Sequence, residues 1–172
     1  MKMKVQDFDE FEVYCSRYRV APFHAKIQAS SGAVRGSPKN GHHPRPKRPN
    51  DIKFGDTLMA PNELLSIENA RTVHHPCACL CEWGERSIAL LVGTDGQRLN
   101  PRYRSEYVCV DATPDNGLEK FTAFKRKAIT RPFRPVARLY PEWHLGRLDD
   151  AQRAVICNAV IDPESTEGGR PS

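Results

Sequence analysis

The most regular pattern of apolar and polar positions lies between residues 77 and 111. Three short segments there, CACLCEW, RSIALLVG and RYRSEYVCVDA, are rich in the residues that favour β-strands. Gly84-Glu85 separates the first two segments, and Asp95-Gly96, a dipeptide favoured in type I′ turns, follows the second. The pattern predicts a central three-stranded antiparallel meander around 77–111.

The remaining elements are predicted from shorter signals. Residues 8–29 alternate as two strands interrupted by Ala21-Pro22, and DIKFGDTL, from residue 51, has the pattern of one more short strand. The segment APNELLSIENA, from residue 60, predicts a short helix with Asn62 as its N-cap. Together with the meander, these segments make the sheet the larger part of the fold.

The second half of the chain contains two helical patterns and one extended one. In residues 114–129, Leu118, Phe121, Phe124 and Ile129 recur near one helical face, and Asp115 or Asn116 is placed to cap it. The next segment, TRPFRPVARLYPEW, contains three prolines, which predicts an extended conformation. The segment RLDDAQRAVICNAVI, from residue 147, predicts a second helix with Asp149 as its N-cap.

These elements predict an α+β fold in which two or three helices pack on a mainly antiparallel sheet. We expect a single domain over residues 1–161. Residues 30–51 contain four prolines, three glycines and almost no apolar side chain, so they predict a flexible basic loop. Residues 162–172 are expected to form a disordered tail.

The three cysteines of the first predicted strand raise the question of a metal or redox site. Cys77, Cys79 and Cys81 should point the same way, but alternate residues of a strand lie about 6.6 Å apart. Two sulfurs bound to one zinc ion lie only about 3.8 Å apart, as the Zn–S distance of about 2.3 Å requires. Ala78 and Leu80 between them are also apolar. We therefore interpret the segment as a central strand, buried on both faces, with structural thiols.

Two other interpretations of this segment remain open. One is a metal site formed by His74, His75 and one or two of the cysteines Cys77, Cys79 and Cys81. The other is a catalytic cysteine, for which His24 and His144 are candidate bases. The chain lacks the common nucleotide, hydrolase and zinc-protease motifs, so an enzyme is the least favoured class and no cofactor is expected.

Charge is the strongest functional signal. The chain has a formal net charge of +5, yet residues 118–140 alone have seven basic residues and one acid, whereas residues 141–172 have three and six. The basic run is interleaved with Phe121, Phe124, Phe133 and Tyr140, of which the first two are better explained as core residues. The candidate phosphate-binding residues are Arg45, Lys47, Arg48, Lys120, Lys125, Arg126, Lys127, Arg131, Arg134 and Arg138.

The segregated charge predicts a non-enzymatic protein that binds nucleic acid mainly through phosphate contacts. The alternatives are a protein-interaction module or inhibitor that binds an acidic or nucleic-acid-binding partner, and a charged face that serves solubility only. The longest apolar run is IALLV, at 88–92, and the N-terminal residues have no apolar stretch of signal-peptide length. We therefore expect a cytoplasmic protein with no membrane partner.

Overall fold

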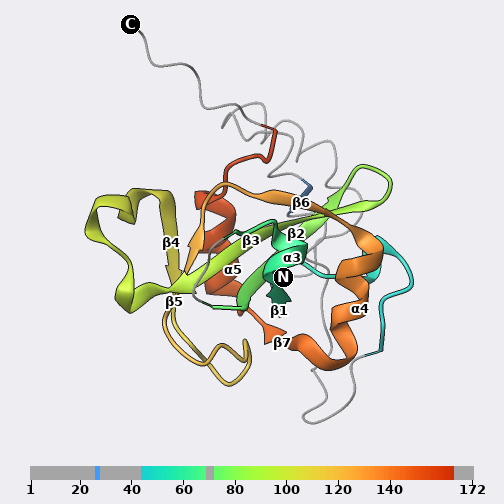
Figure 1. Ribbon diagram of the computed structural model, residues 1–172, viewed down its shortest axis with the longest axis horizontal. Coiled ribbons are helices and arrows are strands. Elements are labelled where there is room, and N and C mark those ends of the chain that lie inside the picture. Colours follow the sequence, from blue (N-terminus) through green and yellow to red (C-terminus); the bar gives the residue numbers. More distant parts are fainter. Residues whose placement is uncertain (1–25, 28–43, 69–71, 165–172) are drawn as a thin grey trace, which may run out of the picture.

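The computed structural model describes residues 26–27, 44–68 and 72–164, and its centre is a curled antiparallel sheet (Figure 1). The strands are β1 (Asp56–Pro61), β2 (His74–Trp83), β3 (Ser87–Asp95), β4 (Tyr107–Val110), β5 (Thr122–Lys125), β6 (Ile129–Pro132) and β7 (His144–Arg147). Their order is β4-β5-β3-β2-β1-β7, and β6 also pairs with β3. The α+β fold with a mainly antiparallel sheet is confirmed.

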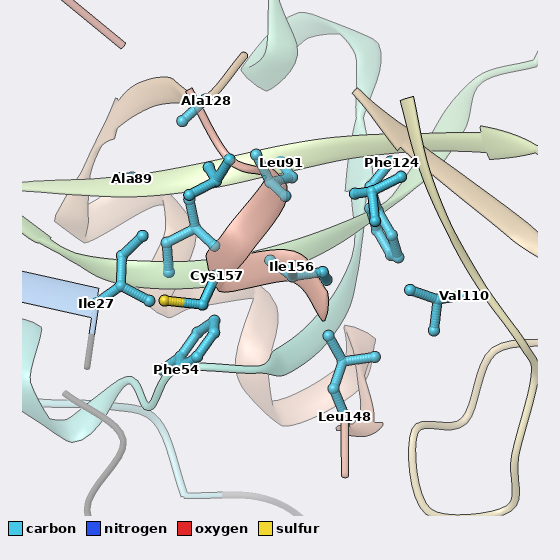
Figure 2. Close-up of a cluster of buried hydrophobic side chains, with 14 of the residues drawn as sticks. Ile27, Phe54, Ala89, Leu91, Val110, Phe124, Ala128, Leu148, Ile156 and Cys157 are labelled. Atoms are coloured by element: carbon cyan, nitrogen blue, oxygen red, sulfur yellow. The ribbon is translucent and has the colours of Figure 1, made fainter. Parts of the chain in front are cut away.

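Helices cover both faces of this sheet. Helix α5 (Asp150–Ala159) places Ile156 and Cys157 against one face, among Phe54, Leu91 and Phe124 (Figure 2). The short helix α3 (Asn62–Leu65) and the longer α4 (Phe133–Trp143) pack on the other face. The two hydrophobic cores, which we call the α5-side core and the α4-side core, meet at the central strands β2 and β3.

Strand β2 is buried on both faces, as its sequence predicts, but its cysteines do not all point the same way. Cys79 pairs with Leu90, whereas Cys81 pairs with Ala89, so a β-bulge at Leu80 adds one residue to β2. The extra residue moves Cys81 to the opposite face. Cys77 and Cys79 therefore belong to the α4-side core, whereas Cys81 belongs to the α5-side core.

The predicted meander is only partly correct. Strands β2 and β3 form an antiparallel hairpin whose turn contains Gly84 at a φ of 67°, a conformation that favours glycine. Strand β4, however, pairs with β5 and not with β3. Asp95-Gly96 does not form a tight hairpin turn, because two 3-10 helices, η3 (Gly96–Arg98) and η4 (Pro101–Glu106), carry the chain away from β3 first.

Residues 114–143 differ most from the prediction. The apolar residues expected on a helix at 114–129 lie instead in and around strands β5 and β6, and the segment expected to be extended forms α4. Pro132 precedes α4 and Pro135 lies in its first turn, where backbone amides have no intrahelical acceptor. Val136, Ala137 and Tyr140 then give α4 a buried face. Proline content alone was therefore misleading here.

The two other predicted helices are present. Helix α3 is a single turn, and its N-cap is Pro61, not Asn62. Helix α5 has the predicted N-cap, Asp149, whose carboxylate accepts a hydrogen bond of 2.7 Å from the Gln152 amide. The Gln152 side chain accepts one of 3.3 Å from the Asp149 amide in return, which completes a capping box.

Asn116, expected to cap a helix, instead organises the connection between β4 and β5. Its side chain is fully buried; the carbonyl oxygen accepts from the amides of Thr113 and Leu118, and the amide group donates to Asp111 and Gln152. Its backbone oxygen accepts a bond of 2.6 Å from the Thr57 hydroxyl of β1. Asn116 thus fastens this connection to both β1 and α5.

Several predictions fall wholly or partly outside the described residues. Of the strands expected at 8–29, the structure describes only Lys26 and Ile27, which are helical, with Ile27 buried in the α5-side core. Of the loop expected at 30–51 it describes residues 44–51, which end in the 3-10 helix η2 (Pro49–Asp51). Of the tail expected at 162–172 it describes residues 162–164.

The cysteine environment leads to a labelling prediction. Burial raises the pKa of Cys77 and of Cys81 to about 12, and Cys79 is completely buried. A thiol reagent at neutral pH should therefore modify half-buried Cys109 in the folded protein long before these three. Peptide mapping by mass spectrometry checks this expectation, with urea-unfolded protein as the control. Equal labelling of Cys77 and Cys109 in the native state would contradict the placement of β2.

Candidate nucleic-acid interface

The basic run of the sequence includes β5 and β6, which follow one another along β3 and are separated by a short interruption. Strands β5 and β6 pair with the same edge of β3, Phe124 opposite Gly93 and Ile129 opposite Leu90. Between these two pairs, four residues (125–128) stand opposite only two residues of β3, Leu91 and Val92, so this segment contains two extra residues. We call this segment, residues 125–128 with the sequence KRKA, the basic bulge.

Backbone hydrogen bonds hold the basic bulge in place. The Arg126 amide donates to the Glu106 carbonyl at 2.8 Å, and the Arg126 carbonyl accepts from the Ile161 amide at 2.7 Å. The Ala128 amide donates to the Ile161 carbonyl at 3.0 Å, and the Ala128 side chain is buried in the α5-side core. The bulge is consequently clamped between the end of η4 and the segment that follows α5.

A shallow pocket of about 300 Å³ lies along the bulge and the outer side of β6. Three of the predicted phosphate-binding residues, Lys125, Lys127 and Arg131, line it together with Pro163. The complete lining is Lys125, Lys127, Ala128, Ile129, Thr130, Arg131 and Pro163. Strand β6 pairs only with β3, so among the described residues its other edge is not covered by a strand. We call this site the basic pocket.

Arg131 also has a structural role. Its Nε donates to the Leu64 carbonyl at 2.5 Å and its Nη2 to the Leu65 carbonyl at 2.6 Å, so it satisfies the last carbonyls of α3. Its Nη1 donates to its neighbour Thr130 at 2.6 Å. A guanidinium group has five N–H donors, and these contacts use three of them.

Arg126 points away from the basic pocket. Its Nε donates to the Ala159 carbonyl at 2.8 Å, at the end of α5, where a cation also interacts favourably with the helix dipole. Its Nη1 donates to the Ser105 carbonyl at 3.0 Å. Arg126 therefore joins α5, η4 and the bulge. The three consecutive basic residues Lys125, Arg126 and Lys127 do not lie on the helix expected over 114–129, because Lys125 ends β5 and forms the basic bulge with the residues after it.

The other predicted residues lie apart from the basic pocket. Arg134 and Arg138 are exposed one turn apart on α4, directly after β6. Residues 45–48 lie on the same side of the molecule as α4 (Figure 1), and Ile52, which follows them, belongs to the α4-side core together with Val136 and Tyr140. The exposed basic residues on this side of the molecule are Arg45, Lys47, Arg48, Arg134 and Arg138. Lys120 is elsewhere, 2.9 Å from the Asp95 carboxylate.

The aromatic residues of the basic run are not available for stacking. Phe124 and Tyr140 are buried, in the α5-side and α4-side cores respectively. Phe121 lies against Gly96 and Phe133 packs on the α4-side core, so both are partly buried. The interpretation of Phe124 as a core residue is correct, although it belongs to a strand and not to a helix.

Sequence reasoning missed a second basic segment next to the bulge. The connection between β3 and β4 exposes Arg98, Arg102, Arg104 and Tyr103, and we call residues 98–104 the arginine loop. The arginine loop is followed directly by Ser105 and Glu106, whose carbonyls accept hydrogen bonds from Arg126. The signal was present in the letters RLNPRYR, but RYR was assigned to a strand, and strand residues are counted toward the core.

A buried polar cluster is the other concentration of ionisable groups in the described chain. Asp56 of β1 is 6% exposed; its Oδ1 is 3.0 Å from Arg147 Nε and 3.8 Å from His144 Nε2, and its Oδ2 accepts from the Tyr140 hydroxyl at 3.0 Å. Burial alone would raise the pKa of Asp56, but the contacts with His144 and Arg147 outweigh it and hold the pKa below the ordinary value.

This cluster joins secondary-structure elements and lies inside the protein. Asp56 belongs to β1, Tyr140 to α4 and Arg147 to β7, so the contacts bind all three together. Burial, reinforced by the nearby Cys79 and Asp56, raises the pKa of Tyr140 well above its usual range, so its hydroxyl remains a neutral donor. The pocket described above does not include any of these residues. The cluster is therefore best explained as structural.

His74 and His75, considered above as metal ligands, lie at the start of β2. The His74 ring stacks on Trp143 with centroids 4.7 Å apart, and His75 Nδ1 lies 3.2 Å from the Gly93 carbonyl. Within residues 26–27, 44–68 and 72–164, no group of three or more His, Cys, Asp or Glu side chains has the arrangement of a metal site. No helix in the same ranges has the length and apolar character needed to cross a membrane.

Comparisons with known proteins do not assign the chain to a family. No protein-family model, no curated protein and no solved structure gives a significant match.

The double role of Arg131 distinguishes it from Lys125 in a stability measurement. Arg131→Gln removes donors from the α3 carbonyls and should lower the free energy of unfolding by about 1–3 kcal/mol. Lys125→Gln removes the same charge from an exposed position and should change it by less than about 0.5 kcal/mol. Urea denaturation followed by circular dichroism measures both values. Similar small effects for the two variants would show that Arg131 does not support α3.

Asp56 should make the protein sensitive to acid. Its folded-state pKa lies below the unfolded value near 3.8, so its stabilisation is complete above that value and is lost as the pH falls through the folded pKa. Asp56→Asn should therefore destabilise the protein strongly at pH 7, by roughly 3–5 kcal/mol, and by less at lower pH. Urea denaturation from pH 7 down to pH 3 measures the difference in unfolding free energy between the wild type and Asp56→Asn. A difference that does not change with pH would contradict a lowered pKa for Asp56.

Proposed function

We propose that the protein binds nucleic acid, mainly through phosphate contacts at the basic pocket. The single observation that supports this most directly is that Lys125, Lys127 and Arg131 line one hollow beside β6, whose outer edge pairs with no other strand of the described chain. Ammonium and guanidinium groups bind phosphate by charge and by hydrogen bonds and release condensed counterions. A binding surface of this kind positions the sugar-phosphate backbone and carries little sequence information.

The path of the phosphates extends beyond the pocket. On one side the arginine loop joins the basic bulge through Ser105 and Glu106, and on the other β6 leads directly into α4, which exposes Arg134 and Arg138. Figure 1 shows β6 running from the β4–β5 end of the molecule toward α4. We propose that the basic pocket is the centre of this path and that Arg45, Lys47 and Arg48 supply further phosphate contacts beyond α4.

A binding experiment with varied salt tests the proposal. Each phosphate contact contributes about 0.9 to the slope of log affinity against log salt for duplex DNA, and about 0.7 for single strands. The double variant Lys125→Gln, Lys127→Gln should therefore lower the slope by roughly 1.4–1.8 and weaken binding equally for unrelated sequences. Fluorescence anisotropy with labelled oligonucleotides at several salt concentrations measures the slope.

The controls separate a local effect from a change in total charge. Lys53→Gln removes one positive charge outside the pocket lining and should leave the slope almost unchanged. Arg126 and Arg131 are unsuitable for the main test, because their loss disturbs α5 and α3 as well. If the wild type shows no binding at near-physiological salt, or binding with a flat salt dependence, an acidic protein becomes the favoured partner.

A further inference from the structure

Phosphate contacts alone do not distinguish single strands from duplexes, but a base that is unpaired can also stack on an exposed aromatic ring. Tyr103 is the aromatic side chain of the described chain that best meets this requirement. It is 46% exposed, it lies between Arg102 and Arg104, and it belongs to the arginine loop that joins the basic bulge.

Hydrogen bonds hold the backbone of the turn that carries Tyr103. The Tyr103 amide donates to the Asn100 carbonyl at 2.9 Å, and the Asn100 side chain accepts from the Arg102 amide at 3.0 Å. The two residues that follow Arg104, Ser105 and Glu106, are held by Arg126. A side chain presented on such an anchored turn loses little backbone freedom when a ligand binds.

The surroundings of the ring match a nucleic-acid ligand better than an apolar one. Arg102 and Arg104 are exposed next to it, and Arg98 has a side chain that is 88% exposed and 3.7 Å from Asp95. Arginine contacts phosphate bidentately and also stacks on bases through its planar guanidinium group. An apolar protein surface docked on Tyr103 would instead have to bury these charges.

The pairing of β4 with β5 connects Tyr103 to the basic pocket. Tyr107, four residues after Tyr103, pairs across the sheet with Lys125, the first lysine of the basic pocket. Along the chain, only residues 104–106 separate Tyr103 from the residue that pairs with Lys125, and Arg126 holds two of them, Ser105 and Glu106. We infer that the protein prefers single-stranded nucleic acid, held by phosphates at the basic pocket and by an unpaired base stacked on Tyr103. This inference rests on the proposed function.

The test compares single-stranded and duplex oligonucleotides of the same sequence. Tyr103→Ala should weaken binding of the single strand roughly 5- to 150-fold, the range expected for one stacked base, and leave duplex binding unchanged. The salt slope should stay at the wild-type value, since no charge is removed. Tyr103→Phe keeps the ring and should bind single strands almost as the wild type does.

Two further measurements control the result. Trp143→Ala removes a ring that is 38% exposed on α4, at the other end of the molecule, and should not change single-strand binding (Figure 1). A fluorescent adenine analogue in the single strand should change its emission on binding the wild type or Tyr103→Phe, but not on binding Tyr103→Ala. Thermal unfolding should confirm that all three variants fold; a small loss of stability is expected for Trp143→Ala, which also removes the ring stacked on His74.

The outcomes separate this inference from the proposed function. Salt-dependent binding that is equal for both strand forms and unaffected by Tyr103→Ala would overturn the stacking role and keep the phosphate-binding proposal. An equal loss of single-strand and duplex affinity in Tyr103→Ala would also overturn it, because a stacked unpaired base cannot produce that loss. An absence of binding to either form by the wild type would overturn both.

Discussion

Coverage of the β2–β3 hairpin on both of its faces is the constraint that shapes the rest of this molecule. An antiparallel sheet commonly leaves one face to solvent, but here α5 covers one face of these strands and α3 and α4 cover the other. Polar side chains in the middle of these two strands would then be buried without water, so, apart from the paired cluster around Asp56, charged side chains lie mainly on the edge strands, the connections and the outer surfaces of the helices. The basic pocket and the arginine loop lie in such places.

The same constraint explains which elements the sequence revealed. Strands β2 and β3 are apolar on both faces and bounded by Gly84, and α5 begins with the capping residues Asp149 and Gln152, so local signals were sufficient for all three. The segment 114–143 was misread because its phenylalanines recur at a helical spacing by coincidence. Their positions depend on pairing with β3 and β4, which are distant in sequence.

The candidate site could be predicted only in its composition. The excess of charge in residues 118–140 was visible, but the pocket requires the interruption opposite Leu91 and Val92 and the hydrogen bonds to Ile161. Counting charges also overestimates what is available to a ligand. On backbone carbonyls Arg131 uses three of its five N–H donors and Arg126 uses two, whereas within the described residues neither Lys125 nor Lys127 donates a side-chain hydrogen bond of this kind. Longer-range contacts, which a single sequence does not display, decide between these two uses of a cation.

The bulge at Leu80 adds an odd number of residues to its strand, whereas the basic bulge adds an even number. This difference determines which insertions and deletions the sheet can accept. The single extra residue at Leu80 reverses the direction of every later side chain of β2. Its removal would therefore move each side chain from Cys81 to Trp83 to the opposite face of the sheet. The bulge at 125–128 contains two residues more than the facing strand, so shortening it by two would preserve the alternation of both β5 and β6. Insertions or deletions of two residues can therefore lengthen, shorten or remove the basic bulge during evolution while the side chains of β5 and β6 keep their faces of the sheet.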